Sequence, residues 1–187
     1  THEMKVASAQ VKSAIMFAGL NTPGITTIIE KEKTRNHTET LFKYYGYKIN
    51  IEEKDGKNFI SFEGQKALNP VNIKVPGDPS SAAYPVVAGL ICKDSSIKVK
   101  NVLLNPTRDG LYKCLDEMGA NIRYSNKKIE AGEITYDIDV SSSTLSAIDV
   151  PANRAPTMID DYPILAIAAS MANGTSIFRG LSELKVK

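Results

Sequence analysis

The sequence predicts a mixed fold of helices and strands, α/β in the broad sense and α+β in the narrower one. It consists of repeated β-α-β-α-β-β units whose helices pack on one face of a mixed sheet. The first observation behind this is an Ala-rich apolar segment that occurs three times, at residues 8–20, 80–90 and 159–169. Each copy follows small or acidic polar residues and precedes a break and a β-branched run. A repeat of this kind constrains the architecture before any single residue is interpreted.

The second observation is a constant spacing. The pair Thr34-Arg35 recurs as Thr107-Arg108, and Gly46 recurs as Gly119, in both cases 73 residues later (34 to 107 and 46 to 119). Two independent signals with one offset indicate true repetition.

The elements of the first unit follow from the hydrophobic period. Residues 8–20 and 38–45 have the helical period, and Gly46 is placed to end the second helix as its C-cap. Residues 25–29 form a β-branched strand. Residues 47–51 and 58–62 alternate on either side of Asp55-Gly56, which predicts a hairpin.

The same order then recurs. Asp78 and Pro79 are placed as N-cap and first residue of the second Ala-rich helix. The remaining predicted elements are a strand at 96–102, a helix at 110–118, and strands at 121–124 and 136–140 around a polar loop. A third cycle begins near Asp160 with one helix and one strand at 175–178, and it is incomplete at Lys187.

One boundary is visible between the first two units. Pro70 and Val75-Pro76-Gly77 punctuate the chain there. A Pro-Gly step between two similar units is either a hinge or an ordinary surface loop, and the pattern favours neither.

Composition narrows the class of protein. The 187 residues are 42% apolar and 24% charged, with a net charge of +2, which argues against a nucleic-acid partner but allows a local anion pocket. No apolar run is long enough for a membrane span, and the first residues do not resemble a signal peptide. Cys92 and Cys114 lack metal-site spacing, so we expect no metal and two buried thiols in a reducing cytoplasm.

Two helix starts are candidates for chemistry. Ser8-Ala9-Gln10 offers free N–H groups and polar side chains that suit phosphate or carboxylate, although simple capping explains them as well. Asp160 and Asp161 are either capping residues or include a general base, and only one of them is expected to point inward.

Two arginines each precede a predicted helix. Arg35 and Arg108 have the planar fork that grips phosphate, although a solvated surface arginine is commoner. His37 is weak evidence by itself. At Asp78 the carboxylate would repel phosphate, so capping is the favoured interpretation of that helix start.

Five segments together resemble one enzyme family. They are residues 8–14, 75–82, 105–110, 154–163 and 183–187. These segments resemble 5-enolpyruvylshikimate-3-phosphate synthase (3-phosphoshikimate 1-carboxyvinyltransferase), especially its glyphosate-tolerant bacterial class. The resemblance runs from about Lys5 to Lys187, with the segments in the same order and without large gaps. The resemblance implies two lobes of three β-α-β-α-β-β units. Residues 1–75 would be the last unit of one lobe, and residues 76–187 one full and one partial unit of the other.

The resemblance also implies the chemistry. The family transfers the enolpyruvyl group of phosphoenolpyruvate to the 5-hydroxyl of shikimate-3-phosphate and releases phosphate, through a tetrahedral ketal and without a cofactor. By this resemblance Ser8, Ala9, Arg35 and Lys187 contact shikimate-3-phosphate. Gln10 contacts both substrates, and Asp160, rather than Asp161, accepts the 5-hydroxyl proton. The implied complete enzyme is a cytoplasmic monomer that binds small molecules, without nucleic-acid or membrane partners.

Several family segments have no counterpart in this chain, including the N-terminal Lys-Ser segment and the Asn-Ala-Gly-Thr-type loop. The sequence is therefore interpreted as an internal fragment that is inactive alone. Two alternatives stay open. One is UDP-N-acetylglucosamine enolpyruvyl transferase, which is marked by a reactive cysteine in a loop. The other is a non-catalytic α/β module that binds a phosphorylated ligand.

Overall fold

A computed structural model describes residues 1–186 of the chain, so the prediction for Lys187 lies outside the described residues. The chain divides into two compact units, Thr1–Lys74 and Val75–Lys187. Each has its own buried apolar cluster. The predicted α/β class with repeated units is confirmed by the element order within them.

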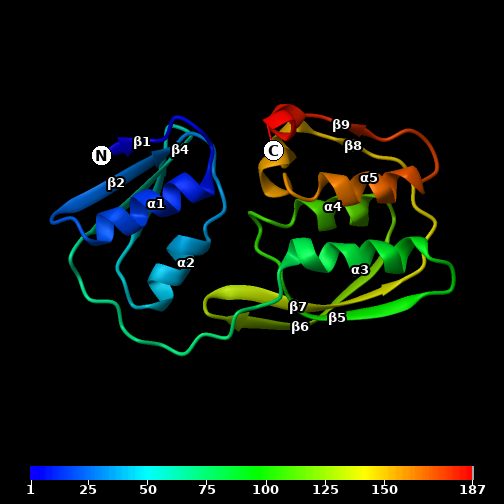
Figure 1. The fold of residues 1–187 in the computed structure, drawn as a ribbon, viewed down its shortest axis with the longest axis horizontal. Helices are drawn as coiled ribbons and strands as arrows, with labels where there is room; N and C mark the ends of the chain where they lie inside the picture. Colours follow the sequence, from blue (N-terminus) through cyan, green and yellow to red (C-terminus); the bar gives the residue numbers. More distant parts are fainter. Residues whose placement is uncertain (187) are drawn as a thin grey trace. The chain divides into compact units, whose positions relative to one another are not determined.

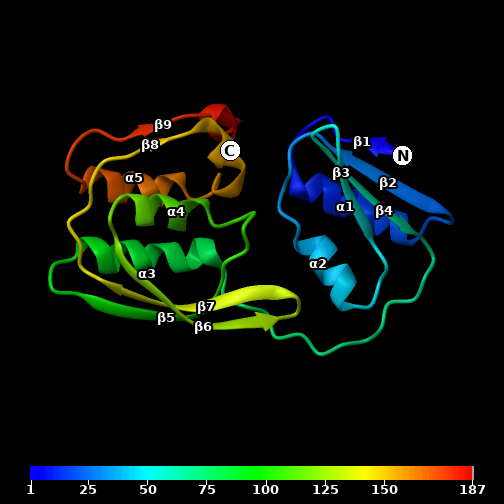
Figure 2. The same ribbon diagram turned by 180° about the vertical axis from the view of Figure 1, so that it is seen from behind.

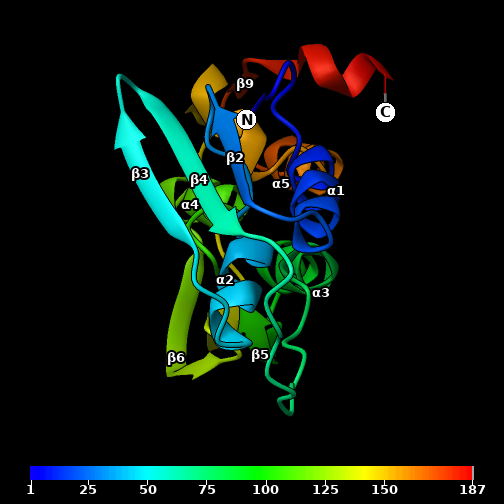
Figure 3. The ribbon, with the colours of Figure 1, turned by 90° about the vertical axis from the view of Figure 1, so that its left-hand side faces the viewer.

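The first unit is a mixed four-stranded sheet with two helices on one face (Figures 1 and 3). Its strands are β1 (His2–Glu3), β2 (Ile25–Glu30), β3 (Asn50–Lys54) and β4 (Lys57–Glu63), in the order β1-β2-β4-β3. β1 runs parallel to β2, and the other pairs are antiparallel. The helices are α1 (Ala9–Leu20) and α2 (His37–Tyr44).

The core of this unit corrects one predicted boundary. β3 begins at Asn50, so residues 47–49 are not in the strand that was predicted for 47–51. Tyr47 is instead buried against Phe42 and Phe62, with ring centroids 5.7 and 6.2 Å away. Its hydroxyl donates to the carbonyl of Glu63 at 2.6 Å. The aromatic core therefore overrides the alternation that the sequence showed here.

The second unit has an antiparallel sheet in the order β5-β7-β6, followed by a short parallel pair. The strands are β5 (Ser96–Leu103), β6 (Asn121–Glu130), β7 (Glu133–Ser141), β8 (Asp149–Val150) and β9 (Ile177–Phe178). β6 and β7 are longer than predicted, because Ala131 and Gly132 both take positive φ (51° and 80°) and close a tight hairpin. The residues predicted to form a polar loop are therefore mostly strand.

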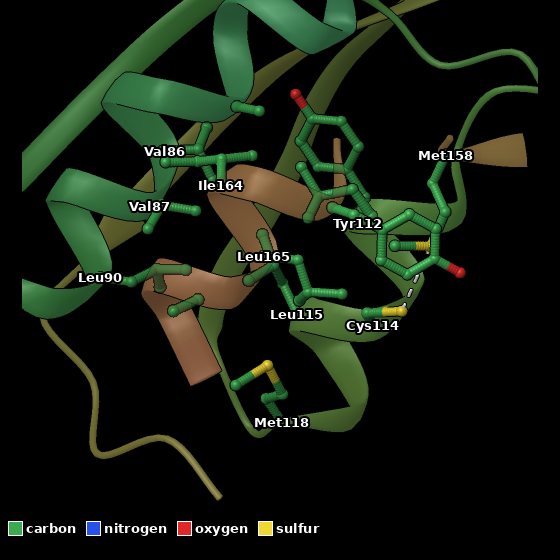
Figure 4. Packing of buried hydrophobic residues seen from close by; sticks show 14 of the residues in the cluster. Val86, Val87, Leu90, Tyr112, Cys114, Leu115, Met118, Met158, Ile164 and Leu165 are labelled. Atoms are coloured by element: carbon green, nitrogen blue, oxygen red, sulfur yellow. Dashed lines mark hydrogen bonds between the residues drawn. The ribbon is translucent and has the colours of Figure 1, made fainter. Parts of the chain in front are cut away.

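Three helices lie on one side of this sheet when it is viewed from the front and from behind (Figures 1 and 2). They are α3 (Pro79–Ile91), α4 (Gly110–Glu117) and α5 (Tyr162–Ser170), with 3-10 turns η1 (Ala152–Thr157) and η2 (Leu181–Val186). Figure 4 shows Leu90, Leu115 and Leu165 from the three helices packed together.

The two cysteines differ. Cys114 is buried, as predicted, and its thiol lies 3.7 Å from the sulfur of Met158 (Figure 4). The prediction of a buried thiol is wrong for Cys92, which is exposed. Cys92 is the C-cap of α3, where the chain leaves the helix in extended conformation and the side chain leaves the apolar face.

The repeat is visible in backbone geometry. α4 is α2 shifted by 73 residues (37 to 110 and 44 to 117). Both helices end in a left-handed glycine, Gly46 with φ 77° and Gly119 with φ 80°. The N–H groups of these glycines and of the next residue bond back into the helix in the same Schellman pattern. The predicted C-cap at Gly46 is therefore confirmed.

Candidate functional site

The first turn of α1 begins at Ser8. Ser8 is the N-cap, with φ −128° and ψ 114°, and its hydroxyl accepts the N–H of Val11 at 3.3 Å. The positive end of the helix and its first-turn N–H groups lie here. The capping role that the sequence allowed for Ser8 is thus present in the structure.

A surface hollow of about 240 Å³ lies beside this turn. Its lining residues come from α1, α2 and the loop between β2 and α2: Ala9, Gln10, Ser13, Arg35, His37 and Thr38. Ala9, Gln10 and Arg35, three of the predicted site residues, are therefore brought together within one unit. Ser8 is their neighbour at the N-cap but is not among the lining residues.

Three lining residues were not predicted as site residues. The hydroxyls of Ser13 and Thr38 lie 2.6 Å apart, which ties α1 to α2 at the hollow. His37 is weak evidence in the sequence, where its position two residues after Arg35 is the signal that links it to this site.

A buried ionic cluster accompanies the hollow. The ammonium of Lys12 lies 3.1 Å from a carboxylate oxygen of Glu30 and 2.6 Å from one of Glu39, and all three side chains are at most 4% exposed. Lys12 and Glu39 are the chain neighbours of Ser13 and Thr38. This cluster was not predicted from the sequence, where the only signal was a lysine within an Ala-rich apolar helix.

The second repeat also places an arginine beside the start of an Ala-rich helix, and there a carboxylate of the protein itself is the anion. Arg108, which is Arg35 shifted by 73 residues, places a guanidinium nitrogen 2.6 Å from the carboxylate of Asp78, the N-cap of α3. The same carboxylate accepts the N–H and hydroxyl of Ser81 at 2.8 and 2.7 Å. The predicted capping role of Asp78 is confirmed. In this repeat the carboxylate of Asp78 therefore caps the start of α3 and also forms the ion pair with Arg108.

The Asp78 carboxyl should make the stability of the second unit depend on pH. Partial burial by itself raises its pKa, but the bonds from Ser81 and the charge of Arg108 outweigh burial and hold the pKa below its usual value. A lowered pKa in the folded state contributes stability above the unfolded value of about 3.9, and this is lost as pH falls through the folded value.

We therefore expect the difference in unfolding free energy between the parent chain and Asp78→Asn to be largest above about pH 4 and to shrink at lower pH. Urea unfolding between pH 2 and 6, followed by far-UV circular dichroism, measures this. A difference that stays constant with pH would contradict the role given to the charged pair.

The paired aspartates lie at the start of α5. Asp161 is at the N-cap and only 4% exposed, and its carbonyl accepts the N–H of Leu165 at 3.0 Å. Asp160 is exposed. The structure thus separates the two carboxylates by burial. η1, which precedes them, is fixed to α4 by Arg154, whose guanidinium makes two bonds of 2.6 and 2.7 Å to Glu117.

Among residues 1–186, no three His, Cys, Asp or Glu side chains are grouped so that they could hold a metal ion. No helix in that part of the chain combines the length and apolarity needed to cross a bilayer.

Comparison with known proteins decides the family. Residues 1–187 match the family described as EPSP synthase (3-phosphoshikimate 1-carboxyvinyltransferase). The chain belongs to the EPSP synthase family. It is 54% identical over 187 residues to the 3-phosphoshikimate 1-carboxyvinyltransferase of Chelativorans sp. and 55% identical over 186 residues to that of Zymomonas mobilis. These alignments cover 100% of this chain but 42% and 41% of the relatives, so the chain spans about two-fifths of their length.

Solved structures confirm the EPSP synthase fold. EPSP synthase from Acinetobacter baumannii matches with a TM-score of 0.88 and 39% identity, covering 100% of this chain and 42% of that one. The enolpyruvyl transferase NikO from Streptomyces tendae matches with a TM-score of 0.62 at 18% identity, covering 88% of this chain and 37% of that one, which shows a shared fold alone. The resemblance inferred from the motifs is thereby confirmed.

Proposed function

We propose that this chain is part of an enzyme that transfers the enolpyruvyl group of phosphoenolpyruvate to the 5-hydroxyl of shikimate-3-phosphate. The observation that carries the proposal is the hollow that gathers Ala9, Gln10 and Arg35 at the start of α1. Family membership supports the same reaction. The proposed partners are these two small molecules, and the reaction uses no cofactor.

The hollow suits the phosphate group of shikimate-3-phosphate. Helix N–H groups and a guanidinium are the two protein groups that bind phosphate most directly. The second repeat supports this assignment from within the molecule, because there Arg108 and the start of α3 hold the carboxylate of Asp78. Ser8 is the N-cap of α1, as Asp78 is of α3, but its side chain is a hydroxyl, and we assign the phosphate of shikimate-3-phosphate to the start of α1 beside Arg35.

Gln10 and Asp160 have roles in the transfer itself. The amide of Gln10 contacts both substrates. In the addition, the 5-hydroxyl oxygen bonds to C2 of phosphoenolpyruvate while the Asp160 carboxylate accepts the hydroxyl proton, and C3 takes up a proton from a general acid as the C2–C3 double bond becomes single, which gives the tetrahedral ketal. In the elimination, the bond from C2 to the phosphate oxygen breaks, one proton leaves the C3 methyl group to restore the double bond, and phosphate is released. The exposure of Asp160 supports this role, since a base must reach its substrate.

The two compact units support a division between lobes. We assign residues 1–75 to one lobe, as its last repeat, and residues 76–187 to the other, as one full and one partial repeat; the compact units Thr1–Lys74 and Val75–Lys187 divide the chain within one residue of that boundary. Val11 and Phe17, two apolar side chains of the mainly apolar helix α1, are 41% and 52% exposed. An apolar helix of this kind is normally covered on all sides, which favours further repeats in the longer protein. The proposed complete enzyme is a cytoplasmic monomer.

The arginine in the hollow provides the test. Arg35→Met should weaken shikimate-3-phosphate binding about tenfold to hundredfold, because it removes a charge-assisted bond to the phosphate. Titration of the 187-residue chain, followed by amide resonances of Gln10 and Thr38, measures the affinity. Arg123→Met, at a side chain that is 78% exposed in the second unit, is the matched control and should bind normally. Equal affinity of Arg35→Met and the parent chain would refute the assignment of the hollow.

Activity distinguishes binding from turnover. Because the chain spans about two-fifths of its relatives, we expect it to bind shikimate-3-phosphate without releasing phosphate from phosphoenolpyruvate. Phosphate release at the rate of a full-length synthase would overturn this expectation.

A further inference from the structure

Arg35 lies on a loop in which the preceding residue, Thr34, bonds back to the end of β2. The loop leaves β2 at Glu30 and enters α2 at His37. Thr34, immediately before Arg35, is buried, and its hydroxyl donates to a carboxylate oxygen of Glu30 at 2.5 Å. The N–H of Thr34 points to the same oxygen at 3.4 Å. Thr34 is therefore fixed to the end of β2, one residue before the arginine that lines the hollow.

The carboxylate that receives Thr34 is itself held in place. Lys12 bridges Glu30 and Glu39, which joins α1, β2 and α2 in a single buried cluster. Buried charges tolerate little displacement, since any movement that breaks a pair leaves an uncompensated charge in a medium of low dielectric constant. The cluster of Lys12, Glu30, Glu39 and Thr34 thus connects the helix that carries Gln10 to the loop that carries Arg35.

The second repeat also fixes the threonine that precedes its arginine, but through an asparagine two residues earlier instead of a glutamate four residues earlier. The hydroxyl and N–H of Thr107, which is Thr34 shifted by 73 residues, both donate to the side-chain oxygen of Asn105, at 2.7 and 2.8 Å. The amide nitrogen of Asn105 donates in turn to Glu133 at 2.8 Å. Arg108 follows directly and grips Asp78. In this repeat the anion is the Asp78 carboxylate of the protein itself. The arginine that binds it follows a threonine that is fixed by two hydrogen bonds.

We propose that Thr34, anchored through Glu30 to Lys12, is a positioning residue that sets the guanidinium of Arg35 for phosphate. The inference rests on the proposed function, because it assumes that the hollow binds the phosphate of shikimate-3-phosphate. Its physical basis is preorganisation: a loop that is already ordered loses less conformational freedom when the anion binds. Thr34 acts through Arg35 and does not itself line the hollow.

Three variants of the 187-residue chain test this. Thr34→Val keeps the shape of the side chain but removes the hydroxyl, and should weaken shikimate-3-phosphate binding about threefold to tenfold, the effect of one lost hydrogen bond. Thr34→Ser keeps the hydroxyl and should restore binding to within about twofold of the parent chain. Thr107→Val makes the same change in the second repeat and should leave the affinity unchanged.

A spectroscopic readout separates positioning from general destabilisation. The side-chain Nε–Hε resonance of Arg35 should move in ligand-free Thr34→Val and stay near its parent position in Thr34→Ser, while Ile28 and Ile60 amide signals in the core remain in place. If Thr34→Val does not fold, Thr34→Ala replaces it, because alanine removes the hydroxyl without placing a methyl group against Glu30.

The outcomes distinguish this inference from the proposed function. Weaker binding by Thr34→Val and Arg35→Met, with rescue by Thr34→Ser, supports both. Weaker binding by Arg35→Met alone, with parent affinity in folded Thr34→Val, overturns the positioning role and leaves the hollow as the phosphate site. If the parent chain does not bind shikimate-3-phosphate, or if Arg35→Met binds as the parent does, the assignment of the hollow fails and the positioning role fails with it.

Discussion

Replacing Lys12 with methionine is expected to lower the free energy of unfolding of the first unit by about 3–5 kcal/mol, the usual cost of removing one partner from a buried ion pair. The ammonium is 1% exposed and lies between the carboxylates of Glu30 and Glu39. Methionine fills a similar volume but leaves two buried carboxylates without their counter-ion. This charge joins β2, α1 and α2, which also share the apolar core around Met16, Ile28 and Phe42.

Urea unfolding measures this loss, with the amide resonances of Ile28 and Ile60 as reporters of the first unit. Lys66→Met is the matched control. Lys66 pairs with Glu63 at 3.1 Å, but both side chains are 59% exposed, and such surface pairs contribute about 0–1 kcal/mol. Similar losses for the two variants would show that burial of the Lys12 cluster does not carry the stability assigned to it.

If Asp160 has the role proposed above, replacing it with asparagine in the proposed complete enzyme is expected to lower kcat by about a hundredfold or more, the usual effect of losing a general base. Asparagine keeps the shape of the side chain but cannot accept the proton of the 5-hydroxyl. Because Asp160 is exposed, the unfolding free energy should change by no more than about 0.5 kcal/mol.

Steady-state phosphate release gives the rate, and thermal unfolding gives the stability. Asp161→Asn is the comparison, since that carboxyl is 4% exposed at the N-cap of α5. It should affect stability more than Asp160→Asn does. Turnover of Asp160→Asn within about threefold of the parent enzyme would remove this carboxylate from the proposed mechanism.

Much of the fold followed from the sequence because its determinants are local. Helix caps at Ser8 and Asp78 bond to N–H groups three residues away. Gly46 and Gly119 have the positive φ that ends a helix. The predicted strand at 47–51 was wrong at its first residues because contacts between distant residues decide the conformation there. The ring of Tyr47 packs in the aromatic core instead of continuing a strand.

The candidate site divides in the same way. The sequence alone was enough to predict features that are patterns within short segments. These are the repeat, the two arginines before helices, the polar helix starts and the family motifs. Only the tertiary structure decided that Arg108 is occupied by Asp78, while Arg35 lines a hollow with Ala9 and Gln10. It also paired Lys12 with two glutamates from other elements. The physical reason is that an ion pair or a pocket depends on distances across the fold, and the order of residues along the chain does not specify those distances.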